Sequence, residues 1–452
     1  MSDTIAAIAT GAQVAAIGII RMSGDGALRL ADALFHPADG RAMSGHADRS
    51  LVYGGLRDRR GELLDLCLCT VSRAPHSYTG EDTAEFQCHG SPVVLRTALE
   101  ELFALGARQA GPGEFTKRAF LNGKMELCSA EAVADIIDAE SAEAARNAAG
   151  QLSGAIGAKI HGIYSALADM SSHYHAVLDY PDEDIEDFRI EAYAGALRAA
   201  LGRLRALLDT FDRGRLMNTG IPAAIVGRPN AGKSSLLNAL LGYDRAIVTS
   251  VPGTTRDTIE EKLRLGGLCL RLIDTAGIRE SGDEAERLGV ARSRAALDSA
   301  ALVIVLVDGS AEYTAEDAQL VAAAERAPHA VIVLSKNDLE QTAGAIATTL
   351  PVVSVSAVTG EGLEELERAI AAMFPLPSVP AGEILTNARQ AEAVKRAAEY
   401  MSAALGALEA GRTPDIVLTE TEGAMAALGE LTGRTVREDV TERIFERFCV
   451  GK

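Results

Sequence analysis

Eight consecutive residues, from Gly227 to Ser234, have the types and spacing needed to bind a polyphosphate. They read Gly-Arg-Pro-Asn-Ala-Gly-Lys-Ser and fit the pattern G-x-x-x-x-G-K-[ST]. The two glycines let the backbone wrap a polyphosphate so that its N–H groups point inward. Lys233 can then reach the outer phosphates, and the Ser234 hydroxyl can bind Mg²⁺. The segment therefore predicts a nucleotide-phosphate site in which Lys233 takes part in catalysis.

Two further segments carry residues suited to the outer phosphates and their metal ion. Asp274-Thr-Ala-Gly277 follows an apolar run. An Asp at this position usually holds the water shell of Mg²⁺, and the Gly N–H contacts the γ-phosphate. Between the phosphate loop and Asp274, the segment Gly253–Asp257 offers Thr255 as a second Mg²⁺ ligand. Both segments favour hydrolysis of a nucleoside triphosphate.

The base is indicated by two segments that follow later strands. Ser335-Lys-Asn-Asp338 places Asp338 where a carboxylate can accept two hydrogen bonds from N1 and N2 of guanine, which adenine cannot donate. Ser356-Ala357 suits a contact with guanine O6. Together with the three phosphate segments in chain order, these residues predict a GTPase.

One expected catalytic residue is missing. Small GTPases often carry Gln directly after D-x-x-G to orient the attacking water, and here that position is Ile278. Nearby acids could take the role, although each is also typical of an exposed helix start. They are Glu280, Asp283, Glu284 and Glu286.

These residues need an alternating α/β frame. Ala223–Val226 is expected to be a strand entering the phosphate loop, and Ser235–Leu241 a helix leaving it, with Gly242 as its end. Apolar runs predict further strands of a parallel sheet. They are Leu268–Ile273, Leu302–Val307, Val331–Leu334 and Val352–Val355.

The 452 residues are too many for one core, and the pattern predicts several domains. Residues 1–118 mix strands (Thr4–Thr10, Ala15–Arg21, Leu63–Val71, Thr83–Cys88) with the helix Pro92–Leu105. Residues 119–215, including Ser129–Gly150 and Ala192–Phe211, are helical, as are residues 377–452. We expect these two helical segments to pack together around an inserted α/β domain, residues 216–376.

Composition restricts the remaining possibilities. The net charge of −19 argues against broad, nonspecific nucleic-acid binding, so a nucleic-acid substrate would need a local patch or a basic partner. No apolar run is long enough to span a bilayer, and the start of the chain lacks a signal-peptide pattern. The six cysteines have no C-x-x-C spacing, and Cys67 and Cys69 are expected to be buried. A cytoplasmic protein with no membrane association is predicted.

Over nearly its whole length the chain resembles the MnmE (TrmE) tRNA-modification GTPases. Phe448-Cys-Val-Gly-Lys452 is similar to that family's terminal F-C-I-G-K, with Val450 as a departure. Further segments that resemble its signatures are Ile20–Gly24, His76–Asp82, His89-Gly90, Gly113–Lys124 and Asp179–Glu183.

The resemblance implies an N-terminal α+β domain that binds tetrahydrofolate and dimerises, a discontinuous helical domain, and an inserted Ras-like P-loop GTPase domain. It implies a homodimer that assembles with an MnmG (GidA)-type flavoprotein into a heterotetramer. Such proteins add an aminomethyl-type group, such as carboxymethylaminomethyl, at C5 of the wobble uridine of certain tRNAs. They use GTP and a tetrahydrofolate one-carbon unit (5-formyl or 5,10-methylene), and FAD and NADH act through the partner.

Site residues follow from the same resemblance. The G domains meet across the dimer around K⁺, which would be held by Asn230 and Thr254 and by the carbonyls of Thr249 and Val251. Glu286 becomes the water-orienting catalytic residue. The folate site maps to Arg21, Glu85, Lys124 and Lys452, although from the residues alone each is more typical of a surface charge. Cys449 alone would be interpreted as a buried thiol, and the resemblance makes it a candidate one-carbon-site residue.

The full predicted GTP site, with Mg²⁺ on Ser234 and Thr255, comprises Asn230, Ala231, Gly232, Lys233, Ser234, Ser235, Thr249, Ser250, Val251, Pro252, Gly253, Thr254, Thr255, Asp274, Thr275, Ala276, Gly277, Ser335, Lys336, Asn337, Asp338, Ser356 and Ala357.

One departure falls inside this site, and two other functions stay open. Ser335 stands where the family carries Asn, which predicts a weaker hydrogen bond that supports the phosphate loop. A ribosome-assembly or signalling GTPase is the main alternative, but residues 377–452 hold nine Lys/Arg against twelve Asp/Glu and no basic RNA-binding loop. A folate-binding scaffold with a vestigial GTPase is disfavoured by the intact Lys233, Ser234 and Asp274.

Overall fold

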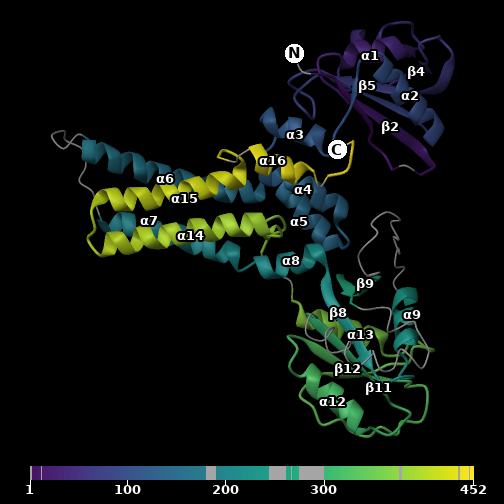
Figure 1. Cartoon of the computed structure of the whole chain (residues 1–452), viewed down its shortest axis with the longest axis vertical. Coiled ribbons are helices and arrows are strands. Elements are labelled where there is room, and N and C mark those ends of the chain that lie inside the picture. Colours follow the sequence, from purple (N-terminus) through teal and green to yellow (C-terminus); the bar gives the residue numbers. More distant parts are fainter. Residues whose placement is uncertain are drawn as a thin grey trace. The chain divides into compact units, whose positions relative to one another are not determined.

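The computed structural model describes residues 3–11, 13–179, 190–243, 261–265, 267–273, 300–375, 379–435, 438–446 and 448–451. Two compact units divide the chain, and each combines segments that are far apart in the sequence (Figure 1). The first contains Met1–Ala134, Gln151–Ala200 and Arg396–Lys452, and the second contains Asp135–Gly150 and Leu201–Lys395.

The first unit contains a seven-stranded sheet in the order β3-β4-β5-β6-β2-β1-β7. Its strands pair antiparallel, except that β7 runs parallel to β1. Alternate residues of β5 and β6 are buried, and the apolar residues of α1 and α2 belong to the same core, so these two helices cover that face. The bounds are β1 Ile5–Ile8, β2 Ala15–Ser23, α1 Ala27–Leu34, β3 Phe35–Pro37, β4 Val52–Arg57, β5 Leu63–Ser72, β6 Thr83–Gly90, α2 Pro92–Ala104 and β7 Arg108–Gln109. The four expected strands and the helix are confirmed within a few residues, whereas β3, β4 and β7 were not predicted.

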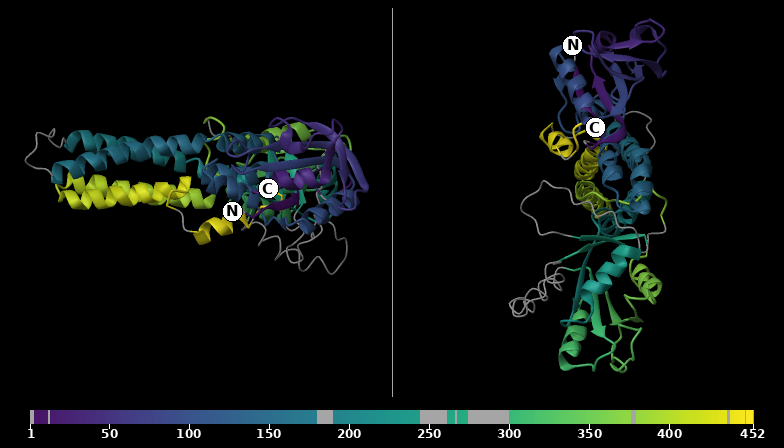
Figure 2. Two further views of the ribbon diagram at one scale, coloured as in Figure 1. Left: turned by 90° about the horizontal axis from the view of Figure 1, so that it is seen from above. Right: turned by 90° about the vertical axis from the view of Figure 1, so that its right-hand side faces the viewer.

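Helices form the rest of the first unit, and Figure 2 shows the long ones lying side by side. The longest, α6 (Ala155–Asp179), packs along α15 (Pro414–Thr432). The pairs Arg198–Glu409 and Arg396–Glu430 link α7 to α14 and α14 to α15. The remaining bounds are α3 Glu114–Leu121, α4 Leu127–Asp138, α7 Ile190–Leu208, α14 Ala388–Glu409 and α16 Glu438–Phe445, whereas α5 (Ala142–Leu152) lies almost entirely in the second unit.

One helix predicted as continuous is interrupted. The segment expected to be helical from Ser129 to Gly150 breaks between α4 and α5, because the Ser141 hydroxyl accepts a hydrogen bond from Ala144 N and starts a new helix. The predicted helix Ala192–Phe211 is confirmed within a few residues as α7, which ends at Leu208, and α8 (Phe211–Thr219) begins after Thr210. No helix in the described residues is long and apolar enough to cross a membrane.

A six-stranded sheet in the order β13-β12-β11-β8-β10-β9 is the core of the second unit. The five predicted strands are confirmed and run parallel, whereas β9, which was not predicted, pairs antiparallel with β10. The bounds are β8 Ile221–Gly227, α9 Lys233–Tyr243, β9 Glu261–Leu265, β10 Leu268–Leu272, β11 Leu302–Asp308, α12 Ala315–Ala324, β12 Ala330–Ser335, β13 Val352–Ser354 and α13 Leu363–Met373. The described part of α9 ends at Tyr243, one residue beyond Gly242, the predicted helix end.

The chain segments that precede and follow this sheet in the sequence meet at one buried amide. Asn147 of α5 is 2% exposed, donates to Ile384 O (3.1 Å), and accepts from Gly382 N (2.8 Å). These bonds join chain that precedes the α/β segment to chain that follows it.

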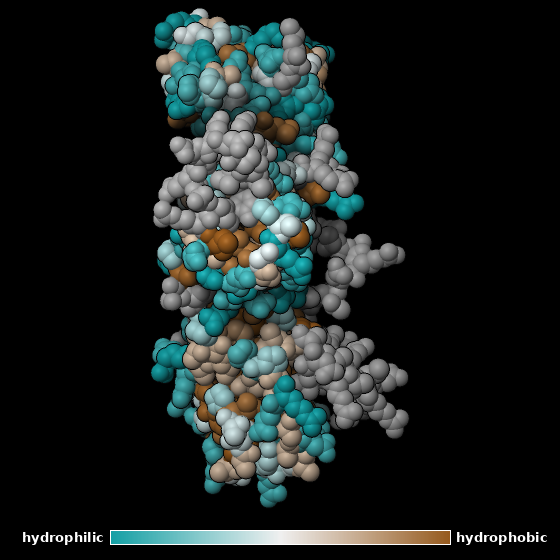
Figure 3. Space-filling model, turned by 90° about the vertical axis from the view of Figure 1, so that its left-hand side faces the viewer, coloured by the Kyte–Doolittle hydropathy of each residue, from teal (hydrophilic) through white to brown (hydrophobic). Residues whose placement is uncertain are grey.

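On the face shown in Figure 3, hydrophilic side chains alternate with small groups of apolar ones.

Candidate active site

The phosphate loop connects the buried strand β8 to α9. Asn230 and Gly232 have positive φ values of 64° and 97°, so two left-handed residues bend the loop. Gly227 lies against β11, where an added Cβ would be 2.6 Å from Leu306 O. A side chain at Gly227 would therefore push the loop away from the sheet, which explains the need for glycine at this position.

Lys233 lies inside the curve of this loop. Its Nζ donates to Gly227 O (2.7 Å) and Arg228 O (2.8 Å), and burial lowers its pKa. The loop is fixed from outside because Arg228 pairs with Asp317 (3.0 Å), a 2%-exposed carboxylate that also caps α12. An ammonium held by carbonyl oxygens is ready to exchange them for the stronger charge of phosphate oxygens.

Of the predicted guanine-site residues, Ser335, Lys336, Asp338 and Ala357 line one cavity of about 190 Å³ beside the loop. Asp338 accepts a hydrogen bond from Ser356 Oγ (2.7 Å), which fixes one carboxylate oxygen. Lys336 has a left-handed φ of 60° and pairs with Asp308 (2.5 Å). The cavity is lined by Gly232, Ser235, Leu236, Val333, Ser335, Lys336, Asp338, Leu339, Val355, Ala357 and Val358.

Ser335 supports the phosphate loop directly. Its hydroxyl lies 2.7 Å from Ala231 O and 3.2 Å from Val307 O, and the residue is 7% exposed. The shorter side chain still reaches the loop carbonyl of Ala231, and the expectation that its support is weaker than that of Asn stays a prediction. A hydroxyl has one proton, so it serves Ala231 or Val307 at any moment, whereas an amide could serve both.

Several predicted residues lie outside the described part of the chain. They are Thr249, Ser250, Val251, Pro252, Gly253, Thr254, Thr255, Asp274, Thr275, Ala276, Gly277, Glu286 and Lys452. The assignments of Thr255 to Mg²⁺, of Thr249, Val251 and Thr254 to K⁺, and of Glu286 to water therefore stay predictions. Of the predicted metal ligands, Ser234 lies in the first turn of α9 and Asn230 in the loop before it.

In the sequence, the strands β9 and β10 lie between the two segments of the predicted site that are outside the described residues. Their hairpin contacts the junction of α4 and α5 through Glu140, which pairs with Lys262 and accepts a hydrogen bond from Cys269 Sγ (2.8 Å). At the turn, Gly267 lies against the carboxylate of Glu143. The nucleotide-site strands are therefore attached to helices of the same unit.

A second candidate site lies in the first unit, where Arg21 of β2 and Glu85 of β6 are opposite each other. Arg21 Nε donates to Glu85 Oε1 (2.7 Å), and each side chain is 25% exposed. Rings of Tyr78 and Phe115 lie 5.7 and 5.8 Å from the guanidinium. Within the described residues, Arg21 makes hydrogen bonds only through Nε and Glu85 only through Oε1, so each retains polar atoms for a ligand.

Lys124 and the end of the chain contact the segments that surround this pair. Lys124 Nζ donates to Pro75 O (2.9 Å). Val450 pairs with Pro112, Gly113 N donates to Cys449 O (3.3 Å), and Gly451 lies against Ile8. Because Cys449 itself is exposed, its interpretation as a buried thiol was wrong.

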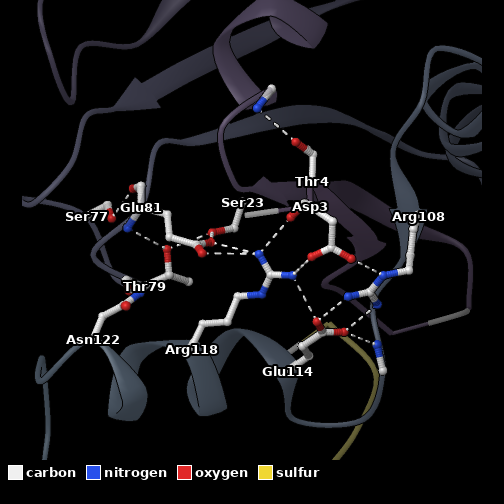
Figure 4. Close-up of polar contacts among 12 residues, drawn as sticks. Asp3, Thr4, Ser23, Ser77, Thr79, Glu81, Arg108, Glu114, Arg118 and Asn122 are labelled. Carbon is white, nitrogen blue, oxygen red and sulfur yellow. Dashed lines mark hydrogen bonds and ion pairs between the residues drawn. The ribbon is translucent and has the colours of Figure 1, made fainter. Parts of the chain in front are cut away.

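A network of charged residues fixes the loop and the helix that carry the two rings (Figure 4). Arg118 of α3 pairs with Asp3 (2.6 Å), Glu81 (3.0 Å) and Glu114 (3.0 Å). Burial would raise the pKa of Glu114, but hydrogen bonds from Arg108, Gly111 N and Arg118 outweigh it and hold that pKa at about 2. Four chain segments are thereby held together beside the Arg21–Glu85 pair.

Sequence reasoning missed the two aromatic residues and Arg118. Tyr78 and Phe115 lie in segments already noted for their resemblance, but an isolated aromatic residue gives no signal of what it contacts. Their position follows from the tertiary structure, in which the Tyr78 hydroxyl is 2.9 Å from Thr116 Oγ1.

Comparisons with known proteins cover the entire chain. A model described as the MnmE helical domain matches residues 127–449, and one described as the GTP-binding protein TrmE N-terminus matches residues 4–124. The tRNA modification GTPase MnmE of Symbiobacterium thermophilum is 43% identical over 455 residues, covering 100% of this chain and 99% of that protein. The protein of the same name from Chloroflexus aurantiacus is 43% identical over 460 residues and covers 100% of both chains.

Proposed function

The chain belongs to the MnmE family of tRNA modification GTPases, and from this premise we propose a specific activity for it. It is a K⁺-stimulated GTPase whose G domains dimerise. With an MnmG-type flavoprotein it installs a carboxymethylaminomethyl or aminomethyl group at C5 of the wobble uridine of certain tRNAs. The carbon comes from a tetrahydrofolate derivative, and FAD and NADH act through the partner.

The GTPase activity is supported mainly by one observation: the phosphate loop and the guanine cavity are adjacent and share a residue. Ser335 contributes to both, because it lines the cavity and hydrogen bonds to Ala231 in the loop. Asp338, oriented by Ser356, can accept hydrogen bonds from the guanine edge. Ser234 supplies a hydroxyl for Mg²⁺, which would neutralise phosphate charge during hydrolysis.

The Arg21–Glu85 pair supports a folate site. The second oxygen of Glu85 can accept hydrogen bonds from the amino-pyrimidine edge of a pterin, and the outer nitrogens of Arg21 can donate to carbonyl or carboxylate oxygens. The rings of Tyr78 and Phe115 beside the guanidinium suit a flat heterocycle. Lys124, with Lys452, would meet the anionic glutamate tail, and Cys449, an exposed thiol, is the candidate at the one-carbon centre.

A monovalent cation explains how hydrolysis proceeds without Gln after the Asp274 segment. Asn230, at a left-handed position in the loop, with Thr249, Val251 and Thr254, would place K⁺ against the transferring phosphate and supply the charge that an arginine finger gives elsewhere. Glu286 would orient the water. The net charge of −19 suggests that the flavoprotein provides much of the tRNA-binding surface.

Nucleoside analysis tests the whole proposal. Wobble-position nucleosides from a strain that lacks the gene should lose the modification, and the wild-type gene should restore it. Unchanged nucleosides in the deletion strain would favour the ribosome-assembly alternative.

In purified protein, GTP turnover should be much faster in K⁺ than in Na⁺, and equal rates would remove the K⁺ assignment. Glu286→Ala should bind GTP but not hydrolyse it; retained turnover would move the role to another acid.

A further inference from the structure

Two thiols and a carboxylate meet on the buried face of the N-terminal sheet, away from both sites described above. Asp65 and Cys67 lie on β5, and Cys88 lies on β6. Leu68 pairs with Gln87, so Cys67 and Cys88 are opposite each other one residue further along the strands. One carboxylate oxygen and the two sulfur atoms all lie within 4.8 Å of one another.

The surroundings hold these three groups close together. Cys67 and Cys88 are 5% and 2% exposed, and the Asp65 side chain is 9% exposed. Asp65 is oriented by His89, whose main-chain N–H and ring Nδ1 both lie 2.8 Å from its oxygens.

We propose that Asp65, Cys67 and Cys88 form a binding site for one thiophilic divalent cation, with Zn²⁺ as the type. Two thiolates and a carboxylate are a donor set that Zn²⁺ favours, whereas Mg²⁺ and Ca²⁺ select oxygen ligands. Tetrahedral ligands at about 2.3 Å are about 3.7 Å apart, so a small contraction of the cluster would complete the site. His89 acts as the outer partner that orients the carboxylate ligand.

Charge and protons balance in this binding step. Each cysteine loses its proton when sulfur bonds to the cation, so two thiol protons are released on binding. With Zn²⁺, two thiolates and one carboxylate would give the site one net negative charge. Alternation along β6 places Glu85 on the opposite face from Cys88, so the cation site is separate from the Arg21–Glu85 pair.

Metal titration of the purified full-length chain tests this inference. After reduction and treatment with a chelator, the protein should bind one Zn²⁺ per chain and release two protons, measured with a pH indicator dye. With Co²⁺ as the probe, a thiolate-to-metal charge-transfer band should appear in the near ultraviolet. Bound Zn²⁺ should also slow the alkylation of Cys67 and Cys88, as read by mass spectrometry without any substitution.

Cysteine variants locate the site. Cys67→Ala and Cys88→Ala should lose the Co²⁺ band, and Asp65→Asn should weaken Zn²⁺ binding about tenfold or more. Cys69→Ala is the matched control, because this buried thiol lies two residues along the same strand and face. Thermal unfolding of the apo variants checks that they fold. A wild-type chain without the band, a Cys67→Ala/Cys88→Ala variant that keeps it, or a Cys67–Cys88 disulfide that replaces metal binding would each overturn the inference.

Discussion

Removing the Ser335 hydroxyl shows how much its hydrogen bond, donated from β12, contributes to holding the phosphate loop in place. In Ser335→Ala the buried carbonyl of Ala231 loses a donor at 2.7 Å. Leaving a buried acceptor unpaired costs about 1–3 kcal/mol, and water from the adjacent cavity of about 190 Å³ can replace part of that bond. We therefore expect a cost near the lower limit, about 1–1.5 kcal/mol, which corresponds to roughly five- to tenfold weaker GDP and GTP binding.

Equilibrium titration with a fluorescent guanine nucleotide measures this effect. Ser335→Asn should keep wild-type affinity or exceed it, because an amide can donate to Ala231 O and Val307 O together. Ser354→Ala is the matched control, since this serine lies on the neighbouring strand β13 but is exposed. If Ser335→Ala bound GDP within about twofold of the wild type, the bond to Ala231 would have no role in holding the loop.

Three further predictions concern the base, the second site and pH. Asp338→Asn should lose GTP affinity about 100-fold and gain affinity for xanthosine triphosphate, because an amide can donate to the xanthine C2 carbonyl; competition binding checks this. Arg21→Ala and Glu85→Gln should weaken 5-formyltetrahydrofolate binding at least about tenfold in calorimetry while K⁺-stimulated GTP turnover stays unchanged; a loss of turnover would indicate a global defect. The pKa of Glu114 in the folded chain, about 2, is below the ordinary 4.5, so its contribution to stability is complete above pH 4.5 and disappears as the pH falls toward 2. Glu114→Gln should therefore show a smaller fall in melting temperature over that range than the wild type, and parallel curves would contradict the assignment.

The parallel strands of the second unit could be predicted because they are apolar runs, and a recognisable segment follows β8, β10, β12 and β13. β9 escaped prediction because Lys262–Leu265 alternates charged and apolar residues on an edge strand, a pattern weaker than a buried run. The break between α4 and α5 was missed because helix propensity is summed over a window of many residues. A single N-cap, here the Ser141 hydroxyl, is enough to start a new helix.

For the sites, side-chain chemistry was predictable but pairing was not. Asp338 could be assigned from its position after a strand, because the carboxyl ends of parallel strands meet at one edge of the sheet. Nothing local places Arg21 opposite Glu85, 64 residues away, or the chain end beside Ile8, since both depend on the order of strands in the sheet. The contact of Ser335 with the loop carbonyl could not be predicted, because it depends on a distance that residue types do not determine.

The position of the β9–β10 hairpin gives the GTPase site a physical connection to the helices of its own unit. β9 follows the predicted K⁺- and Mg²⁺-binding segment, and β10 leads directly into Asp274. Both strands contact a single carboxylate, Glu140, through Lys262 and Cys269. Burial and this carboxylate raise the pKa of the Cys269 thiol to about 12, so it remains a neutral donor. A shift of either strand during hydrolysis must therefore lengthen a charge-assisted bond to the α4–α5 junction or move that junction with it.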